Sequence, residues 1–249
     1  MRSYECRPRF GFFKFAVLAM LVLLSLCSCF SKGKNVDPAD RFIQELSRKD
    51  PAVRWNAATA LGAMKEARAV DALMAALREE DVTVRGAAAV ARGKIRDARA
   101  VEPLVAALND ENYSVRRKAV DALGSIGPPA IESLKAVPGD PDSRAKGGAA
   151  DALGKIAGPL VDALKDRDET LRTTAAQDLV RIGVPAVKPL VNALKNKDAT
   201  LRNEAAGVLE RIGSAALEPL VNALKDKDLS VRSGASDALG RIGGPAVEP

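Results

Sequence analysis

Apolar residues recur at helical spacing through most of the chain, and short turns interrupt them at regular intervals. Val115, Ala119 and Leu123 stand four residues apart, which places them on one side of a helix. In the same way Leu190 and Leu194 belong to an apolar stripe that follows a turn. This alternation predicts pairs of helices, each with one apolar side.

An acid followed four residues later by a base marks the start of each predicted helix pair. Units begin at residues 50, 81, 112, 142, 168, 198 and 228, which gives spacings of 31, 31, 30, 26, 30 and 30 residues. One such pair buries too little apolar surface to fold alone, so we expect the units to stack on a continuous core. The pairs are Asp50/Arg54, Asp81/Arg85, Asn112/Arg116, Asp142/Lys146, Asp168/Arg172, Asp198/Arg202 and Asp228/Arg232.

The predicted helix ends carry their own signals. First helices end near a glycine, as at Gly127 and Gly183, which suits a left-handed C-terminal cap. Second helices begin near a proline, as at Pro103, where the missing N–H is tolerated. Small residues such as Ala88 and Ala89 recur after the motif base, and they let neighbouring helices approach closely.

The two ends of the repeat region differ from its middle. Residues 37–49 align with a second helix alone, so we expect an N-terminal capping helix there. At the other end the chain stops at Pro249, where the second helix of the last unit should continue. A solenoid that ends with a bare first helix exposes apolar surface, so we expect an incomplete last repeat and a truncated sequence.

The shared unit has a recognisable consensus, D-x-x-V-R-x-x-A-A-x-A-L-G-x-I-G followed by A-V-x-P-L-x-x-A-L-x-D. It resembles the short HEAT-like repeat named after phycobilisome lyases, over about residues 37–249. The resemblance implies an all-α fold, a right-handed α-α superhelix of about six to seven two-helix repeats with the second helices on the concave side. It also implies that most relatives are protein-binding scaffolds. Some attach bilins to phycobiliproteins, and related solenoids bind DNA or carry a metal-dependent hydroxylase site.

The N-terminus has the pattern of an export signal. A basic start precedes an apolar run over residues 15–30, which is shorter than the ~18–20 residues of a usual bilayer span. The run ends in Leu26-Cys27-Ser28-Cys29, which resembles the bacterial lipobox and implies cleavage after Ser28 and acylation of Cys29. We expect a signal peptide at 1–28, a lipidated cysteine with a tether at 29–36, and a lipoprotein anchored in the bacterial cell envelope that faces the periplasm or the exterior. An uncleaved membrane anchor and an ordinary secreted protein are the alternatives.

Composition excludes several kinds of site. The chain has no histidine, which removes Ser-His-Asp and Cys-His catalysis and the usual histidine metal sites. All three cysteines lie within the first 29 residues, so the repeats hold no thiol nucleophile or disulfide. The net charge is +6, but residues 30–249 hold 34 bases against 31 acids, which does not indicate a nucleic-acid footprint. We therefore expect no enzyme activity, cofactor, metal or nucleic-acid partner.

The repeated acid/base pairs permit two interpretations. As framework, the acid caps the helix start and the base forms an acid-first pair with it, worth about 0.3–0.5 kcal/mol. Repeated in every layer, such pairs interlock into a ladder along the stack. As function, they form a row of anion-binding sites. We favour the framework, because both residues follow the repeat rather than any one surface.

Function is expected where the copies diverge on an exposed face. Positions of the second helices that point away from the apolar stripe differ from unit to unit and carry no aromatic residue. They suit a broad protein contact better than a base-stacking groove or an apolar pocket, although ordinary solvated surface is the alternative. These candidate partner-binding residues are Asp71, Arg78, Glu102, Asn109, Asp162, Lys165, Lys188, Asn192, Lys195, Glu218, Asn222 and Lys225.

These patterns favour a non-catalytic scaffold, anchored to a membrane by its lipid, that binds a protein partner on its concave helix face. The alternative is a bilin lyase-like protein or another enzyme accessory, and a nucleic-acid-binding solenoid comes third. The absence of histidine and the export signal argue against the first alternative, and the charge argues against the second.

Two anomalies interrupt the repeat. Arg92 occupies a position where the other units have leucine, and we expect it to snorkel or tilt its helix, or to mark a functional site, because burying an unpaired guanidinium is too costly. Residues 136–161 contain prolines and paired glycines and lack four residues of the usual turn. A local change in curvature or a hinge is expected there, with harmless decay of the repeat as the alternative.

Overall fold

The computed structural model describes residues 36–137 and 144–243. The chain divides into two units, Met1–Asp37 and Pro38–Pro249, and the second unit contains every helix described below. The predicted lipidation site Cys29 and the motif acid Asp142 lie outside the described residues. Within the described residues there is no strand, and no helix is both long and apolar enough to cross a membrane.

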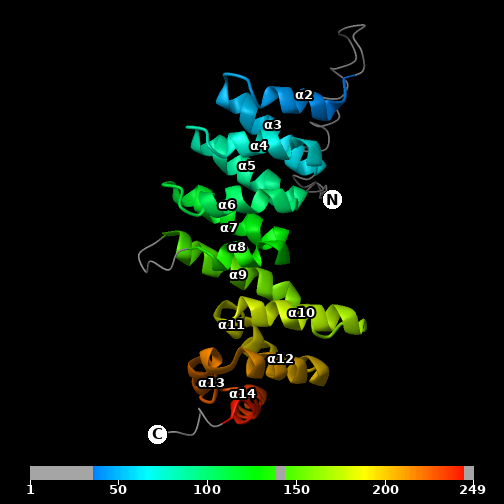
Figure 1. Ribbon diagram of the computed structural model, residues 1–249, viewed down its shortest axis with the longest axis vertical. Helices are drawn as coiled ribbons and strands as arrows, with labels where there is room; N and C mark the ends of the chain where they lie inside the picture. Colours follow the sequence, from blue (N-terminus) through cyan, green and yellow to red (C-terminus); the bar gives the residue numbers. More distant parts are fainter. Residues whose placement is uncertain (1–35, 138–143, 244–249) are drawn as a thin grey trace, which may run out of the picture. The chain divides into compact units, whose positions relative to one another are not determined.

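Helices stack in chain order within the second unit, from α2 (Pro38–Glu45) to the last described helix (Figure 1). The stack confirms the predicted arrangement of helix pairs, and α2 occupies the place of the predicted capping helix. Each first helix other than that of the fourth unit has 14 residues. These first helices are α3 (Pro51–Met64), α5 (Val82–Ile95), α7 (Tyr113–Ile126), α10 (Glu169–Ile182), α12 (Ala199–Ile212) and α14 (Leu229–Ile242).

Second helices are shorter, and in most units a single 3₁₀ turn precedes them. The 3₁₀ turns are η2 (Ala67–Ala69), η3 (Ala98–Ala100), η4 (Pro128–Ala130) and η5 (Gly213–Ala216). The second helices are α4 (Val70–Ala76), α6 (Val101–Ala107), α8 (Ile131–Lys135), α11 (Val184–Ala193) and α13 (Leu217–Ala223).

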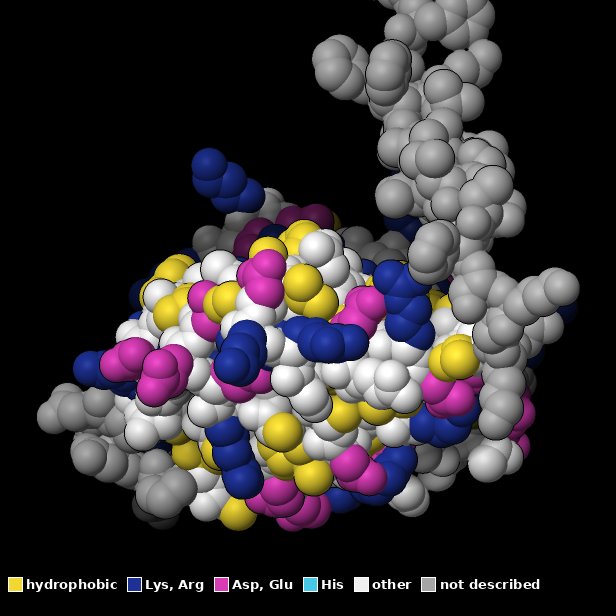
Figure 2. Space-filling model, turned by 90° about the horizontal axis from the view of Figure 1, so that it is seen from above, with side chains coloured by type: hydrophobic (Ala, Val, Ile, Leu, Met, Phe, Trp, Pro, Cys, Tyr) yellow, Lys and Arg dark blue, Asp and Glu magenta, His cyan; other side chains and the backbone are white. Residues whose placement is uncertain are grey.

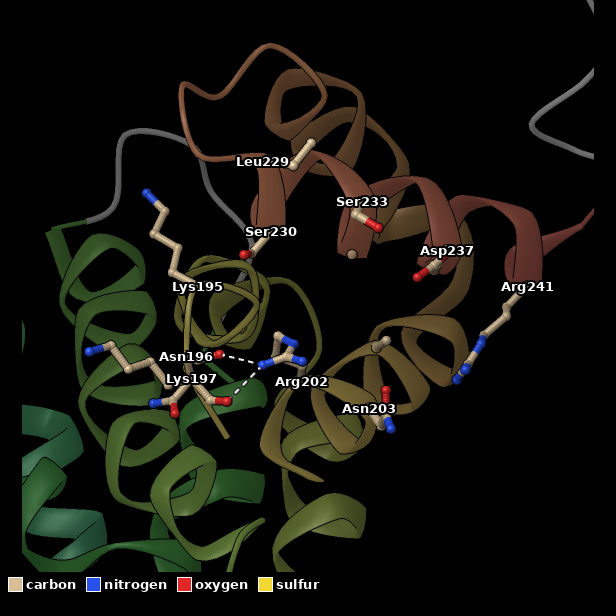
Figure 3. A pocket seen from close by; sticks show the side chains of 12 residues that line it. Lys195, Asn196, Lys197, Arg202, Asn203, Leu229, Ser230, Ser233, Asp237 and Arg241 are labelled. Carbon is tan, nitrogen blue, oxygen red and sulfur yellow. Dashed lines mark hydrogen bonds between the residues drawn. The ribbon is translucent and has the colours of Figure 1, made fainter. Parts of the chain in front are cut away.

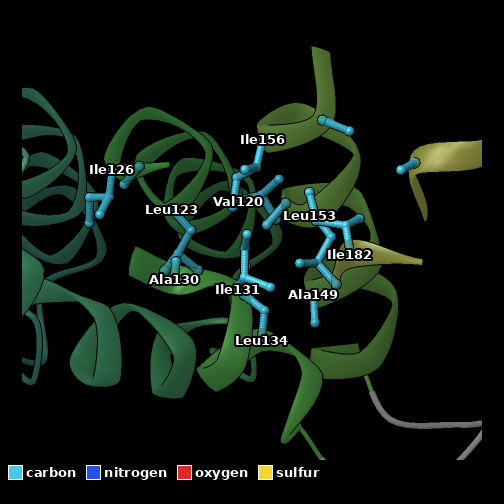
Figure 4. Close-up of a cluster of buried hydrophobic side chains, with 14 of the residues drawn as sticks. Val120, Leu123, Ile126, Ala130, Ile131, Leu134, Ala149, Leu153, Ile156 and Ile182 are labelled. Carbon is cyan, nitrogen blue, oxygen red and sulfur yellow. The ribbon is translucent and has the colours of Figure 1, made fainter. Parts of the chain in front are cut away.

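The core runs between the two rows of helices and consists of aliphatic side chains. Figure 4 shows one layer, in which Val120 and Leu123 of α7 lie beside Ile131 and Leu134 of α8. The next unit adds Leu153, so neighbouring units share one continuous cluster of buried residues. Because each layer is completed by its neighbour, the apolar stripes seen in the sequence are buried only in the stack.

A residue with positive φ ends almost every first helix. Gly127 and Gly183 have φ values of 86° and 72°, and the same position is held by Lys65 and Arg96 in the first two units, with φ values of 54° and 58°. The predicted glycine stops are therefore present, but the glycines have ψ near −140° rather than the left-handed helical value, as at Gly183 with −131°. Only Lys65 and Arg96 have the left-handed conformation itself.

The fourth unit does not form two helices. A single 20-residue helix, α9 (Arg144–Ala163), runs through the place where other units turn, with Pro159 inside it. This unit lacks four turn residues, among them the residue that has a positive φ at the end of other first helices. Ala157, which follows Ile156 directly, is helical and buried. The prediction of a helix pair is wrong here, because without the turn residues nothing stops the first helix. The expected hinge remains a prediction.

Glycines set how closely the first helices approach. A Cβ added at Gly62 would lie 2.6 Å from Cα of Ala91, and one added at Gly93 would lie 2.6 Å from Cα of Ala122. Each glycine therefore lies directly against an alanine of the next first helix, and α3, α5 and α7 pack in close contact. In α10 and α12 the corresponding residues are Val180 and Glu210, which cannot enter such a close contact.

Candidate functional site

All twelve candidate partner-binding residues lie exposed on or directly after the second helices. Each second-helix segment contributes at least two of them, except α8. They are Asp71 on α4 and Arg78 after it; Glu102 on α6 and Asn109 after it; Asp162 on α9 and Lys165 after it; Lys188 and Asn192 on α11 and Lys195 after it; and Glu218 and Asn222 on α13 and Lys225 after it. The structure therefore brings them onto one row of helices.

Two hollows interrupt this second-helix face. The first, about 390 Å³ in volume, lies between α6, α8 and the start of α9, where Glu102, Asn109 and Ser133 meet Val105 and Val137. Ser133 Oγ–H donates a 2.6 Å hydrogen bond to Glu102 Oε1 across it. Mixed polar and aliphatic linings of this kind suit side chains of another protein.

A second hollow of about 380 Å³ lies between α9 and α11. Lys188 and Asn192 line one side, and Asp151 and Lys155 of α9 line the other. Lys155 Nζ also contacts Asp121 Oδ1 of α7 at 2.6 Å, which ties α9 to the unit before it. Four of the twelve candidate residues thus border hollows of a size that admits side chains of a partner.

Charges of both signs are mixed over the exposed surface. On the side shown in Figure 2, basic and acidic side chains lie next to one another with apolar side chains between them. Among the described residues two cross-unit ion pairs use a candidate residue, Arg99 with Asp71 at 3.9 Å and Lys195 with Asp226 at 3.2 Å. Exposed pairs of this kind contribute little to stability, about 0–1 kcal/mol each.

The acids of the repeated motif cap the first helices. In six units the side-chain oxygen of the first motif residue accepts a hydrogen bond of 2.8–2.9 Å from the backbone N–H two residues later. The N–H groups at a helix start have no partner within the helix, so these bonds fix where each helix begins. At Asp81 the Thr83 hydroxyl and the N–H of Val84 donate as well, and these hydrogen bonds lower the pKa of its carboxyl.

The motif arginines do not pair with the acid of their own motif. In each of these six units the arginine Nη1 donates to two backbone carbonyls, five and six residues earlier, at 2.7–3.1 Å. Each guanidinium thereby closes the turn before its helix. The predicted ion pair four residues apart is wrong, because capping engages the acid and the turn engages the base. The six residues are Arg54, Arg85, Arg116, Arg172, Arg202 and Arg232.

A ladder between units exists, but other acids form it. Arg54 Nε lies 2.6 Å from Glu79 Oε2, and Arg85 Nε lies 2.8 Å from Asp110 Oδ2. These acids stand two residues before the first motif residue of the next unit, and the sequence interpretation missed them. Burial raises the pKa of Asp110, but the hydrogen bonds from Arg85 and from the N–H of Asn112 outweigh it, so its pKa is lowered overall.

The predicted ladder does not extend to Arg232 in the last unit, and this assignment is corrected. Arg232 Nη1 donates to the carbonyls of Asp226 and Lys227 at 2.9 and 3.0 Å, while Asp228 accepts from the N–H of Ser230 at 2.8 Å. Across residues 36–137 and 144–243 Arg232 makes no ion pair. It closes the turn before α14 and does not pair with Asp228, because each of the two side chains is engaged by the backbone.

Three further motif arginines also depart from the predicted ladder. Arg116, Arg172 and Arg202 close their turns but make no ion pair within the part of the chain that the structure describes. In the fourth unit Lys146 lies exposed on α9, and the pair Asp142/Lys146 stays a prediction because Asp142 lies outside the described residues. Among the motif arginines of the described residues the ladder is therefore confined to the first units, whereas the turn closure recurs along the stack.

Arg92 is the largest fully buried side chain of the described residues, with 0% of its surface exposed. Its Nη2 donates to the carbonyl of Arg99 at 3.2 Å, while its Nε and Nη1 have no hydrogen-bond partner. The prediction that Arg92 snorkels to solvent is wrong, because it lies at the leucine position of the core. Burial lowers the pKa of Arg92 to about 10, against the favourable charges of Asp97 and Asp71.

Two exposed aromatic residues lie on the first-helix side, away from the twelve candidates. Trp55 is 43% exposed and, with Val90, Lys94 and Lys118, borders a hollow of about 210 Å³ between α3, α5 and α7. Tyr113 is 66% exposed, and the Arg116 guanidinium lies 5.6 Å from its ring centre. Their rarity in the sequence was a usable signal for an exposed contact.

No cluster of three or more carboxylate, cysteine or histidine side chains that could hold a metal ion occurs in residues 36–137 and 144–243. The contacts found there cap helices, close turns and join units. What the arrangement offers chemically is an extended surface of varied side chains on a rigid repeat.

The chain belongs to the HEAT-repeat family. The family model for HEAT repeats matches residues 39–112, 101–176, 157–220 and 187–249. Together with the stacked helix pairs, this match confirms the predicted all-α solenoid. A search of the curated proteins finds no match.

Solved structures of other proteins are similar at low identity. A designed armadillo repeat protein in complex with the peptide (KR)4 is 19% identical, with 83% of this chain and 100% of that chain covered and a TM-score of 0.46. The complex of CpcE and CpcF of phycocyanin lyase from Nostoc sp. PCC7120 is 28% identical, covers 86% of this chain and 91% of that chain, and has a TM-score of 0.40. Human deoxyhypusine hydroxylase in complex with glycerol is 26% identical, covers 84% and 86%, and has a TM-score of 0.39.

Proposed function

We propose that this protein is a non-catalytic interaction scaffold that binds a protein partner along its second-helix face. The observation that carries the proposal is the contrast between buried and exposed positions. The buried leucines and alanines repeat from unit to unit, whereas the twelve exposed second-helix residues change in charge and size. A surface that varies on a constant framework distinguishes one partner from another, because each unit presents different groups.

The lining of the two second-helix hollows supports a protein rather than a small-molecule ligand. Both are bordered by charged residues, an amide and short aliphatic side chains, without an aromatic residue; the first has one charged residue and the second has three. Small-molecule sites are mostly apolar and aromatic, whereas protein contacts combine a few aliphatic anchors with a polar rim.

Site-specific photocrosslinking tests this proposal in cells. A photoreactive amino acid replaces Asn109, Asn192 or Asn222 on the second-helix face, and Asn56 or Gln177 on exposed first-helix positions serves as the control. We expect the same partner to be crosslinked from at least two second-helix positions and from neither control. Crosslinks of equal yield from both sets would refute the assignment of the face.

The proposed scaffold is a lipoprotein of the bacterial cell envelope, held on a membrane through Cys29. The lipobox-like Leu26-Cys27-Ser28-Cys29 at the end of an apolar run supports this. Acyl chains contribute about 0.8 kcal/mol per buried CH₂, so more than one chain gives firm attachment. Metabolic labelling with a fatty acid should be lost in Cys29→Ser and retained in the matched variant Cys27→Ser. Label that persists in Cys29→Ser would show that the anchor is assigned to the wrong residue.

A further inference from the structure

A polar pocket of about 470 Å³ lies between α12, α14 and the turn that joins α11 to α12. Figure 3 shows Lys195, Lys197 and Arg202 on one side of it, and Ser230 and Ser233 of α14 on the other. Of these residues, the sequence interpretation assigned Lys195 to the partner-binding surface and Arg202 to the framework, with anion binding by the motif pairs as the interpretation that was not favoured. The pocket therefore adjoins the second-helix face through Lys195 but is built mainly from first helices.

This pocket exists because α12 and α14 do not interlock as the N-terminal first helices do. The position held by Gly62 and Gly93 in those helices is Glu210 in α12. Nothing lies within 4 Å of a Cβ added at Gly207 of α12, so no part of α14 packs against this glycine. Small side chains at the pocket wall leave the space between the two helices open to solvent.

Arg202 differs from its counterparts in the first two units. Its Nη1 donates to the carbonyls of Asn196 and Lys197 at 2.8 and 2.9 Å, as in the other units. Arg54 and Arg85 also make ion pairs with an acid in the turn before the next first helix. For Arg202 the acid at that position is Asp226, which pairs with Lys195 at 3.2 Å instead. Within the described residues Arg202 makes no ion pair, so its remaining N–H groups face the pocket without a carboxylate.

The charge of the pocket is predominantly positive. Lys197, Arg202 and Arg241 line it without an ion pair among the described residues, and Asp237 is its one acid. A guanidinium whose turn-side nitrogen is already held by two carbonyls is fixed in place, so it offers its other N–H groups in a set direction. Such a fork matches the two oxygens of a carboxylate, and nearby lysines strengthen the attraction.

We propose that this pocket binds an acidic segment of the protein partner, with a glutamate or aspartate carboxylate on Arg202. The inference rests on the proposed function, because it takes the partner to be a protein that lies along the second-helix face. Lys195 supports a peptide as the occupant: it borders the pocket and also follows α11 directly, so a chain on that face reaches Arg202 without leaving the surface. The volume admits an acidic side chain with part of its backbone.

Fluorescence anisotropy with the purified full chain in detergent tests the proposal. The probes are a labelled peptide with six consecutive glutamates and the same peptide with six glutamines, and inorganic phosphate serves as a free-anion competitor. We expect the glutamate peptide to bind and the glutamine peptide not to bind. Arg202→Gln should weaken binding about tenfold or more, because it removes the bidentate partner.

Arg172→Gln is the matched control. Arg172 Nη1 donates to the carbonyls of Asp166 and Arg167 at 2.9 and 3.1 Å, so its replacement removes the same turn contacts as Arg202→Gln. Arg172 lines none of the hollows described above. Binding should be unchanged in this variant, and circular dichroism should show equal losses of stability in both.

Three results would overturn the proposal. The first is an equal loss of peptide affinity in Arg202→Gln and Arg172→Gln, and the second is binding of the glutamine peptide. The third is complete displacement of the glutamate peptide by phosphate at a concentration at which free glutamate displaces it equally well. The last result would identify a site for free anions rather than for a peptide. Failure of the peptide to bind, with crosslinks retained at Asn192 and Asn222, would refute the pocket and leave the scaffold intact. Peptide binding without those crosslinks would refute the second-helix face instead.

Discussion

Replacing Arg92 with leucine is expected to stabilise the protein, although arginine is the residue present. The guanidinium is fully buried, and two of its nitrogens have no hydrogen-bond partner. Six other units place leucine at this position, and four of those leucines, Leu61, Leu123, Leu179 and Leu209, are 0% exposed. Leucine therefore suits the surroundings that the fold provides.

The magnitude follows from the buried charge. Burial lowers the pKa of Arg92 from its ordinary range to about 10, and at about 1.4 kcal/mol per pKa unit this corresponds to roughly 3 kcal/mol against the charged form. A buried N–H without a hydrogen-bond partner costs about 1–3 kcal/mol. This is a second estimate of the same burial cost and is not added to the first. The substitution also removes the bond to the Arg99 carbonyl, worth about 1 kcal/mol. A net gain of about 2 kcal/mol remains.

The assay is thermal unfolding followed by circular dichroism. A gain of about 2 kcal/mol raises the transition by roughly 4–8 °C in a chain of this size. Stacked repeats unfold in parts, so amide hydrogen exchange of α5 and α6 is measured as well, and protection should rise there first. Arg78→Leu removes an exposed arginine instead and should leave the transition unchanged. A lower transition temperature for Arg92→Leu would refute the reasoning, since it would mean that the buried guanidinium stabilises its surroundings.

The remaining predictions concern the framework. In urea unfolding, Gly62→Ala should lower stability by about 1–3 kcal/mol, because its Cβ would lie 2.6 Å from the backbone of α5. Gly207→Ala should instead raise stability by about 0.5–1 kcal/mol, because the space around Gly207 is open and alanine favours a helix. Arg85→Gln should cost about 3 kcal/mol at neutral pH. The pKa of Asp110 is lowered below 3.8 in the fold, so the stabilisation that its carboxylate gives is complete above pH 3.8 and is lost as the pH falls through the pKa of the folded protein. The stability of Arg85→Gln in urea unfolding should therefore depend less on acid between pH 6 and pH 2 than that of the unchanged protein. Lys65→Gly should gain about 0.5–1 kcal/mol, because Lys65 has a φ of 54° that glycine adopts without strain, and an unchanged urea midpoint would contradict this.

The helix pairs could be predicted from the sequence because two independent signals coincide. The apolar period gives the helices, and the recurrence of the motif gives the units, so an error in one is corrected by the other. The fourth unit escaped this check. Its 26-residue spacing signalled a loss of four residues from the turn, but the structure was needed to see that this loss joins the two helices into α9.

The ladder was assigned to the wrong acids for a geometric reason. A spacing of four residues suggests a contact on one helix, but Asp81 stands at the helix start with its carboxylate bound to N–H groups. Arg85 turns back to the preceding carbonyls and forward to Asp110, whereas Arg232 makes only the backward contacts among the described residues. Sequence spacing does not reveal such a choice between partners. The sequence did contain a signal for these partners, because Glu79 and Asp110 each stand two residues before the first motif residue of a unit.

The candidate site on the second helices followed from the repeat, but the α12/α14 pocket did not. Its presence depends on how far two first helices stand apart, which depends in turn on one position in each unit. Where that position is glycine, as in α3, the hollow between first helices holds about 210 Å³, and where it is Glu210 the pocket holds about 470 Å³. The same departure from the repeat that weakens packing therefore creates space for a partner. In a solenoid whose core is nearly constant, a substitution at an interlocking position changes the surface as much as a substitution of an exposed residue does, because it decides whether the surface has a pocket there at all.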